Sequence, residues 1–211
     1  GHWGAILATT DGGETWRIQR TDTAEDRPLF AVHFFDTQHG VAVGLWSLVL
    51  TTADGGKTWV ERPMQPPPDS SSADLNLLGL FADARGALYA TGERGMVLQS
   101  VDQGASWRYL PTGYKGSFWT GIALDDGSLL VGGQRGSLFR SDDGGEHWTA
   151  VDSGGHHTQA VYRFCRARFG RRVYAIKGVA DQGRPVWPKR ARRALCKMVG
   201  LGQGTLSNTA S

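Results

Sequence analysis

Four aspartates, Asp11, Asp54, Asp102 and Asp143, recur in one local pattern and are the first candidates for chemistry in this chain. Each stands in the pattern Ser/Thr-x-Asp-x-Gly-x-x-Trp. Carboxylates can act as general acids or bases or hold a metal ion, and they can also accept backbone N–H groups and close a tight turn. A catalytic or metal-binding group is not needed in four equivalent copies. We therefore predict that these aspartates are structural.

The pattern repeats in phase along the first 150 residues. Its tryptophans, Trp16, Trp59, Trp107 and Trp148, are 43, 48 and 41 residues apart. A short apolar segment and a Gly-x-x-Gly turn precede each copy, with Ser47 replacing the second glycine in one of them. Two more apolar segments around a polar turn lie further upstream of the second, third and fourth copies. Each unit thus reads as four short strands joined by turns.

Four antiparallel strands in every 40 to 50 residues are typical of the blade of a β-propeller. The 30 glycines agree with this reading, because turns with positive φ need glycine and helices avoid it. We predict an all-β fold over residues 1–150: a partial β-propeller of about three and a half four-stranded antiparallel blades. We expect the four tryptophans in equivalent buried places.

The repeats resemble a known family. The run from Phe30 to Gly44, Phe-x-x-x-Phe-x-Asp-x-x-x-Gly-x-Ala-x-Gly, followed by Asp54-Gly-Gly-Lys-Thr-Trp59, is similar to the photosystem II stability and assembly factors. These belong to the bacterial-neuraminidase-repeat, or Asp-box, proteins. The resemblance implies a non-enzymatic propeller that binds a protein, such as a membrane-protein assembly intermediate, and a periplasmic or extracytoplasmic location in bacteria.

The Gly-x-x-Gly turns supply the predicted binding site. In an up-and-down blade the turn between the second and third strands lies opposite the Asp-box turn, so these turns should rim one face. Their third positions are Trp3, Trp46, Arg94 and Arg135. Trp and Arg are enriched at the energetic centres of protein interfaces. The insertion over residues 63–74 should lie on the same face, either as a flexible spacer or as a recognition loop.

The enzyme alternative is a sialidase-like glycosidase, since such enzymes also carry Asp-boxes. These enzymes need an arginine cluster, a tyrosine nucleophile with a glutamate partner and an aspartic acid. Arg140 stands outside the expected arginine motif, and Tyr89, Tyr109 and Tyr114 have no recognisable glutamate partner. We therefore predict that the chain is not an enzyme.

The charge changes sign after the last repeat. Residues 1–150 hold 11 Lys and Arg against 18 Asp and Glu, whereas residues 151–211 hold 12 Lys and Arg and only Asp152 and Asp181. We predict a β-α-β segment over residues 151–190, with a helix over 158–169 and a strand from Arg172 to Lys177, and a disordered basic tail over 191–211.

Residues 151–190 resemble the nuclease domain of the large terminase subunit of tailed phages, through the runs Val151–Thr158, Val161–Cys165, Arg171–Gly178 and Gly183–Pro188. The resemblance implies a fusion to a nuclease remnant. Asp152 is the one residue that matches an acid of the two-metal site, and one carboxylate cannot build such a site. The chain has no Walker motif.

Cofactors and metals are not predicted. His156, His157, Cys165 and Cys196 fit no standard zinc spacing, and two cysteines leave the redox compartment open. The run Lys189-Arg-Ala-Arg-Arg193 would be the contact if DNA were a partner. The expected partner is a protein.

Overall fold

The computed structural model of the protein describes residues 1–152, except Thr23 and Asp69, and beyond them the backbone of four short strands. The chain divides into two compact units, Gly1–Lys177 and Gly178–Ser211. Among the described residues, the first unit contains three four-stranded sheets and two two-stranded sheets. The second contains the two-stranded sheet of β17 (Ala180–Asp181) and β18 (Arg184–Pro185).

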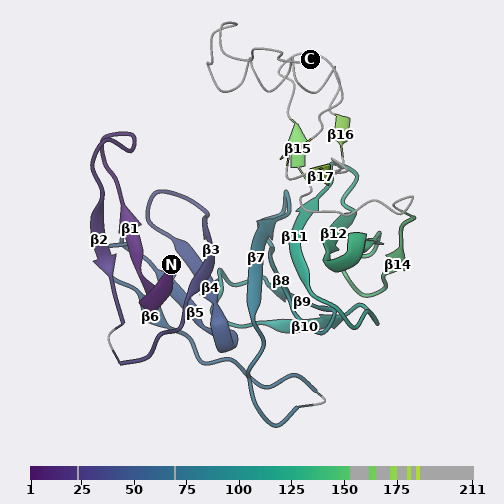
Figure 1. Ribbon diagram of the computed structural model, residues 1–211, viewed down its shortest axis with the longest axis horizontal. Helices are drawn as coiled ribbons and strands as arrows, with labels where there is room; N and C mark the ends of the chain where they lie inside the picture. The colour runs from purple at the N-terminus through teal and green to yellow at the C-terminus, as the bar shows by residue number, and fades with distance from the viewer. Residues whose placement is uncertain are drawn as a thin grey trace, which may run out of the picture. The chain divides into compact units, whose positions relative to one another are not determined.

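Three four-stranded antiparallel sheets follow one another along the chain, each with its strands in sequence order (Figure 1). We call them blades 2, 3 and 4. Blade 2 consists of β3 (Leu29–Phe34), β4 (Gly40–Gly44), β5 (Val49–Thr52) and β6 (Val60–Glu61). Blade 3 consists of β7 (Leu77–Ala82), β8 (Leu88–Gly92), β9 (Met96–Ser100) and β10 (Arg108–Pro111). Blade 4 consists of β11 (Phe118–Ala123), β12 (Leu129–Gly133), β13 (Leu138–Ser141) and β14 (Thr149–Ala150).

A two-stranded hairpin precedes them. It is formed by β1 (Ile6–Ala8) and β2 (Arg17–Arg20), which correspond to the third and fourth strands of the later blades, and we call it blade 1. Together the sheets confirm the all-β fold class and the partial propeller of four-stranded antiparallel blades.

The hydrophobic core lies between neighbouring blades. Val41, Val43 and Val49 of blade 2 pack with Leu77 and Leu88 of blade 3. A second cluster joins Phe81 and Tyr89 of blade 3 to Phe118, Leu129 and Val131 of blade 4. The second strand of blades 2, 3 and 4 is buried along its whole length, because it is covered on both faces. This explains why β4, β8 and β12 are built almost entirely from apolar and small residues.

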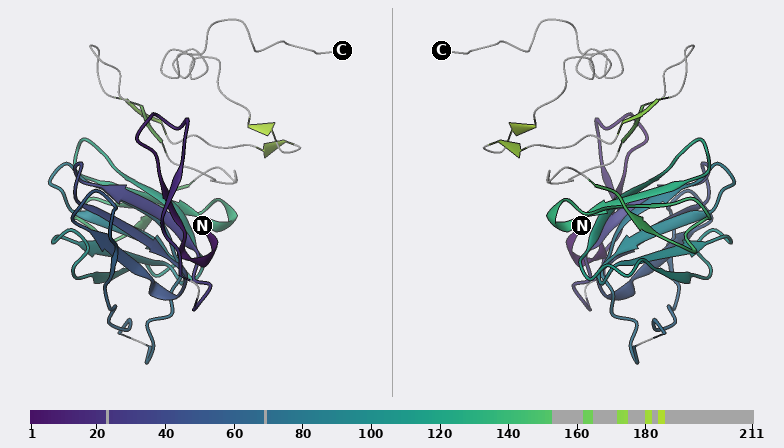
Figure 2. Two further views of the ribbon diagram at one scale, coloured as in Figure 1. Left: turned by 90° about the vertical axis from the view of Figure 1, so that its left-hand side faces the viewer. Right: turned by 90° about the vertical axis from the view of Figure 1, so that its right-hand side faces the viewer.

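The two ends of the blades carry different turns. The loop of hairpin β1–β2, which holds the first Asp-box, extends from one end of the sheets, and the segment between β6 and β7 extends from the other (Figures 1 and 2). Antiparallel strand order places the turns between second and third strands at the end opposite the Asp-boxes. The Gly-x-x-Gly turns therefore share an end with the linkers that join one blade to the next.

The prediction of a helix over residues 158–169 is wrong for residues 162–164, the part of that segment that the structure describes. Tyr162–Phe164 form strand β15, which pairs antiparallel with β16, Arg172–Tyr174. The parallel pairing implied by a β-α-β unit is therefore also wrong. The run Tyr-Arg-Phe alternates aromatic and polar residues and favours a strand, and a short apolar run does not distinguish helix from strand by period alone. The rest of that segment and the predicted tail lie outside the described residues.

Candidate functional site

The Gly-x-x-Gly turns have the same backbone in every blade. The first glycine avoids a collision: a Cβ at Gly44 would lie 2.1 Å from the carbonyl oxygen of Pro28, and one at Gly133 would lie 2.0 Å from that of Ser117. The second position adopts positive φ, +67° at Gly95 and +54° at Ser47. The motif thus lets the turns of blades 2, 3 and 4 fold back against the linker that leads into their own blade.

The residue immediately before the second glycine position, the third of the motif, is also left-handed, and in no blade is it glycine. Trp3, Trp46, Arg94 and Arg135 have φ values of 55°, 51°, 55° and 58°. All four side chains are exposed. A non-glycine residue in this region costs roughly 1–2 kcal/mol, and such strain is concentrated at functional sites. The four predicted residues therefore occupy one equivalent, strained position in successive blades.

Backbone hydrogen bonds join these turns and the linkers into one continuous rim. The turns of blades 2 and 3 donate to the linker of their own blade and to the linker of the following blade, the turn of blade 4 donates to its own linker, and the turn of blade 1 accepts from Asp22 N and Leu29 N. The bonds run from Leu45 N to Pro28 O (2.9 Å), Ser47 N to Leu75 O (2.6 Å), Glu93 N to Asn76 O (3.3 Å), Gly95 N to Gly116 O (2.7 Å) and Gln134 N to Ser117 O (2.9 Å). We call this assembly of turns and linkers the rim. Because turns and linkers alternate along it, the residues of both contribute to one surface.

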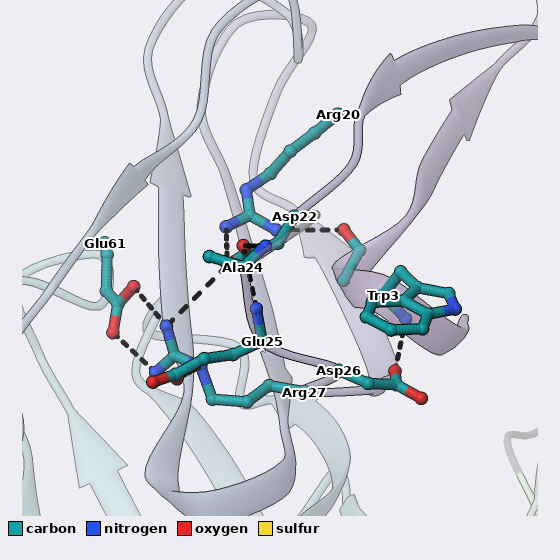
Figure 3. Close-up of polar contacts among 9 residues, drawn as sticks. Trp3, Arg20, Asp22, Ala24, Glu25, Asp26, Arg27 and Glu61 are labelled. Carbon is teal, nitrogen blue, oxygen red and sulfur yellow. Dashed lines mark hydrogen bonds and ion pairs between the residues drawn. The ribbon is translucent and has the colours of Figure 1, made fainter.

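At blades 1 and 2 the rim is acidic and aromatic. The backbone nitrogen of Trp3 donates to the carboxylate of Asp26, and Arg27 forms a two-pronged ion pair with Glu61, with both N–O distances 2.8 Å (Figure 3). Arg27 also pairs with Glu25 at 3.2 Å. Hydrogen bonding to Glu61 raises the pKa of Arg27 above its ordinary value. Arg27 thus ties the linker before blade 2 to that blade's outer strand.

At blade 3 the rim holds an exposed ion pair. Arg94 Nη1 lies 3.2 Å from Asp74 Oδ1, and Nη2 lies 3.3 Å from Oδ2. These hydrogen bonds keep the pKa of Asp74 below its usual value. Asp74 belongs to the linker, three residues before β7. The equivalent linker residues are Asp26 before β3 and Lys115 before β11, and aligning the linkers would have revealed all three from the sequence.

The proline-rich linker before blade 3 is anchored at several points. Pro67 is buried, Met64 packs against the core between blades 2 and 3, and Tyr109 donates to the carbonyl oxygen of Gln65 at 2.7 Å. These contacts do not fit a free spacer over the first half of the insertion. The linker instead supports the rim next to Arg94.

The Asp-box side chains form hydrogen bonds within their own turns. In blade 2, Asp54 Oδ1 accepts from the backbone nitrogen of Thr58 at 2.9 Å and from the hydroxyl of Thr52 at 2.9 Å, and Oδ2 accepts from the Thr58 hydroxyl at 2.6 Å. The same bonds recur at Asp11, Asp102 and Asp143, with His147 replacing the second hydroxyl in blade 4. Both oxygens of each carboxylate thus accept hydrogen bonds from their own loop.

These bonds stabilise the ionised carboxylates. Hydrogen bonds from Thr58 lower the pKa of Asp54 to about 2, and those from Thr15 and His147 lower the pKa values of Asp11 and Asp143. Partial burial raises the pKa of Asp102, but its hydrogen bonds from Ser106 outweigh this and the net shift is downward. A carboxyl group held this acidic is a poor proton donor near neutral pH.

The Asp-box tryptophans make one equivalent bond, from each indole nitrogen to the carbonyl oxygen of the glycine two residues after the aspartate. Their burial is not equivalent. Trp59, Trp107 and Trp148 are half-buried against clusters shared with the preceding blade, whereas Trp16 is 58% exposed. The prediction of burial is wrong for Trp16 because no blade precedes β1–β2 among the described residues.

The tyrosines considered for glycosidase chemistry have structural partners. Tyr89 is fully buried, stacks on Phe81 and accepts a hydrogen bond from Gln99. Burial raises the pKa of Tyr89. Tyr114 donates to the carbonyl oxygen of Gln134 on the rim. These positions hold the blades together and leave Tyr89 inaccessible to a substrate.

The remaining candidates lie at or beyond the limit of the described residues. Asp152 is exposed. The residues 156, 157, 165, 189–193 and 196 lie outside the described part of the chain. Within that part, no group of three or more His, Cys, Asp or Glu side chains could hold a metal ion, and no helix has the length and apolar character to cross a bilayer.

Comparison with known proteins explains the repeated blades. Residues 16–173 match the family described as photosynthesis system II assembly factor YCF48. The chain belongs to this family. The YCF48-family match continues through β15 and into β16, part of the segment that resembles a terminase, and the comparisons do not show a terminase relationship.

The solved structures that resemble the chain are propellers. YCF48 bound to D1 peptide is 27% identical with a TM-score of 0.51, over 59% of this chain and 40% of that one. A protein of unknown function from Dyadobacter fermentans is 17% identical with a TM-score of 0.53, over 76% of this chain and 60% of that one. An ancestral GH74 enzyme is 17% identical with a TM-score of 0.55, over 76% of this chain and 26% of that one. The last two show the fold alone. A comparison with curated proteins finds no match.

Proposed function

We propose that this YCF48-family chain is a non-enzymatic propeller module that binds a polypeptide partner on its rim and serves photosystem II assembly. The observation that carries the proposal is the equivalent left-handed residue in four successive blades, Trp3, Trp46, Arg94 and Arg135. Glycine would adopt that backbone with less strain. Large aromatic and guanidinium side chains at these positions fit a surface for recognition.

The similarity to a YCF48 structure bound to D1 peptide supports a peptide partner. The chain spans 40% of the length of that protein, so a partner shared with it is part of the proposal. The Asp-box end of the blades supports the same choice of surface indirectly. Its carboxylates are bonded to their own turns, and its arginines Arg85 and Arg140 pair with Asp83 and Asp142, so these groups are already engaged within the chain.

The test is binding of the D1 peptide to the 211-residue chain, measured by fluorescence anisotropy. The paired variant Arg94→Ala/Arg135→Ala should weaken binding at least about tenfold, the effect of one to two interface centres. The matched control is Arg85→Ala/Arg140→Ala, which removes the same charge at the Asp-box end, where these side chains pair with Asp83 and Asp142. Equal binding by the two double variants would refute the assignment of the rim.

A further inference from the structure

Three cationic side chains follow one another along the rim at blades 3 and 4. Arg94 and Arg135 stand in the turns, and Lys115 stands in the linker between them. The linker is held between the two turns by the bonds from Gly95 N to Gly116 O and from Gln134 N to Ser117 O. We call these three residues the cationic arc. All three are exposed.

The arc reverses the charge of the preceding part of the rim. The linker position three residues before the first strand is acidic before blades 2 and 3, as Asp26 and Asp74, and basic before blade 4, as Lys115. Among the residues that the structure describes, Lys115 and Arg135 make no side-chain hydrogen bond or ion pair. Adjacent cations without a local counter-charge create a positive potential that attracts anionic groups.

Arg94 indicates which anionic group fits. Its two terminal nitrogens each face one oxygen of Asp74, the forked arrangement in which guanidinium groups recognise carboxylates. The two side chains are 54% and 42% exposed, so a second carboxylate can approach the pair from solvent. Exposed ion pairs are weak and exchange readily. Asp74 therefore occupies a place that a partner's carboxylate could take.

We propose that the cationic arc binds a carboxylate-bearing segment of the protein partner, and that Asp74 competes with this segment for Arg94. The inference rests on the proposed function of the rim and adds the chemistry of the partner, a third binding residue in Lys115, and an internal competitor. Binding exchanges the Arg94–Asp74 pair for an Arg94–partner pair. The net affinity is set by the difference between the two.

The test uses a fluorescein-labelled decaglutamate peptide as the probe, with decaglutamine as the neutral comparison. Asp74→Asn should tighten decaglutamate binding about two- to fivefold, the range of an exposed ion pair. Lys115→Ala and Arg135→Ala should each weaken it by a similar factor. In the double variant Asp74→Asn/Arg94→Ala the gain should disappear, because the group that Asp74 blocks is no longer there.

The control for net charge is Asp142→Asn, which removes one negative charge beside Arg140 at the Asp-box end. It should leave decaglutamate binding nearly unchanged. A gain from Asp142→Asn equal to that from Asp74→Asn, or a gain that survives Arg94→Ala, overturns the competition. If the D1 peptide binds the rim while decaglutamate does not bind, the cationic arc is wrong and the proposed function stands. If rim variants change the binding of neither peptide, both the cationic arc and the proposed function of the rim are wrong.

Discussion

Replacing Arg135 with glycine should make the protein more stable while it removes a binding side chain. Arg135 has a φ of +58°, a conformation that costs an L-residue roughly 1–2 kcal/mol relative to its ordinary range. Glycine adopts it freely, but a glycine also raises the entropy of the unfolded chain, which offsets about 0.4–1 kcal/mol. The expected net gain is about 0.5–1 kcal/mol in the free energy of unfolding.

The comparison variant is Arg135→Ala, which removes the same side chain and keeps an L-residue in the strained turn. Its free energy of unfolding should stay close to that of the wild type, since Arg135 makes no hydrogen bond or ion pair with a described residue. Urea unfolding followed by tryptophan fluorescence measures both variants. The melting temperature of the glycine variant should rise by about 1–4 °C, as expected for a domain of this size.

The two variants should lose binding of the D1 peptide to the same extent. That result would show that the backbone strain at Arg135 lowers stability while the side chain contributes to binding, as is common at functional sites. Equal stability of Arg135→Gly and Arg135→Ala, or a less stable glycine variant, would refute the reasoning, because the turn would then not be strained.

Four further predictions concern the blades and the C-terminal segment. Gly133→Ala should cost about 1–3 kcal/mol of stability in urea unfolding, because its Cβ meets the Ser117 carbonyl, whereas Gly92→Ala, whose Cβ would lie 3.1 Å from the Asn76 carbonyl oxygen, should cost less. The folded-state pKa of Asp54, about 2, lies below its ordinary value of 3.8, so its stabilisation is complete above pH 4 and is lost as the pH falls towards 2; thermal melts over this range should show a weaker acid dependence in Asp54→Asn. Arg27→Met should cost about 1 kcal/mol, the upper end for partly exposed pairs, because its fork to Glu61 is two-pronged; an unchanged urea midpoint would contradict this. The purified chain should not cleave duplex DNA with magnesium or manganese, and cleavage that Asp152→Asn abolishes would instead make the terminase-like segment a nuclease.

The sequence predicts the blades well because their information is local and repeated. Each Asp-box carries its own hydrogen-bond donors and acceptors within eight residues, so the turn can be recognised without knowledge of the rest of the fold. Four copies in phase then identify the strands between them. Prediction failed at residues 162–164, where a single short apolar run without a repeat could be read as helix or strand.

Only part of the candidate site could be predicted from the sequence. The spacing identified Trp3, Trp46, Arg94 and Arg135, because the third position of each Gly-x-x-Gly turn can be located from the repeat alone. It did not identify Asp74 or Lys115 as their neighbours, because the linkers differ in length and composition and their equivalent positions show only when each linker is aligned on the first strand of its blade. The exposure of Trp16 was missed for a related reason: burial depends on the sheet that packs on the other side, which no local motif describes.

The sequence by itself determined the repeated strands, the Asp-box turns and the residue at the third position of each Gly-x-x-Gly turn, because short-range sterics and hydrogen bonds decide these features. Only the tertiary structure decided that turns and linkers alternate along one rim, that Asp74 pairs with Arg94, and that Lys115 lies between Arg94 and Arg135. These relations join residues 17 to 28 positions apart, which the folding of each linker against its blade and the packing of one blade against the next bring together.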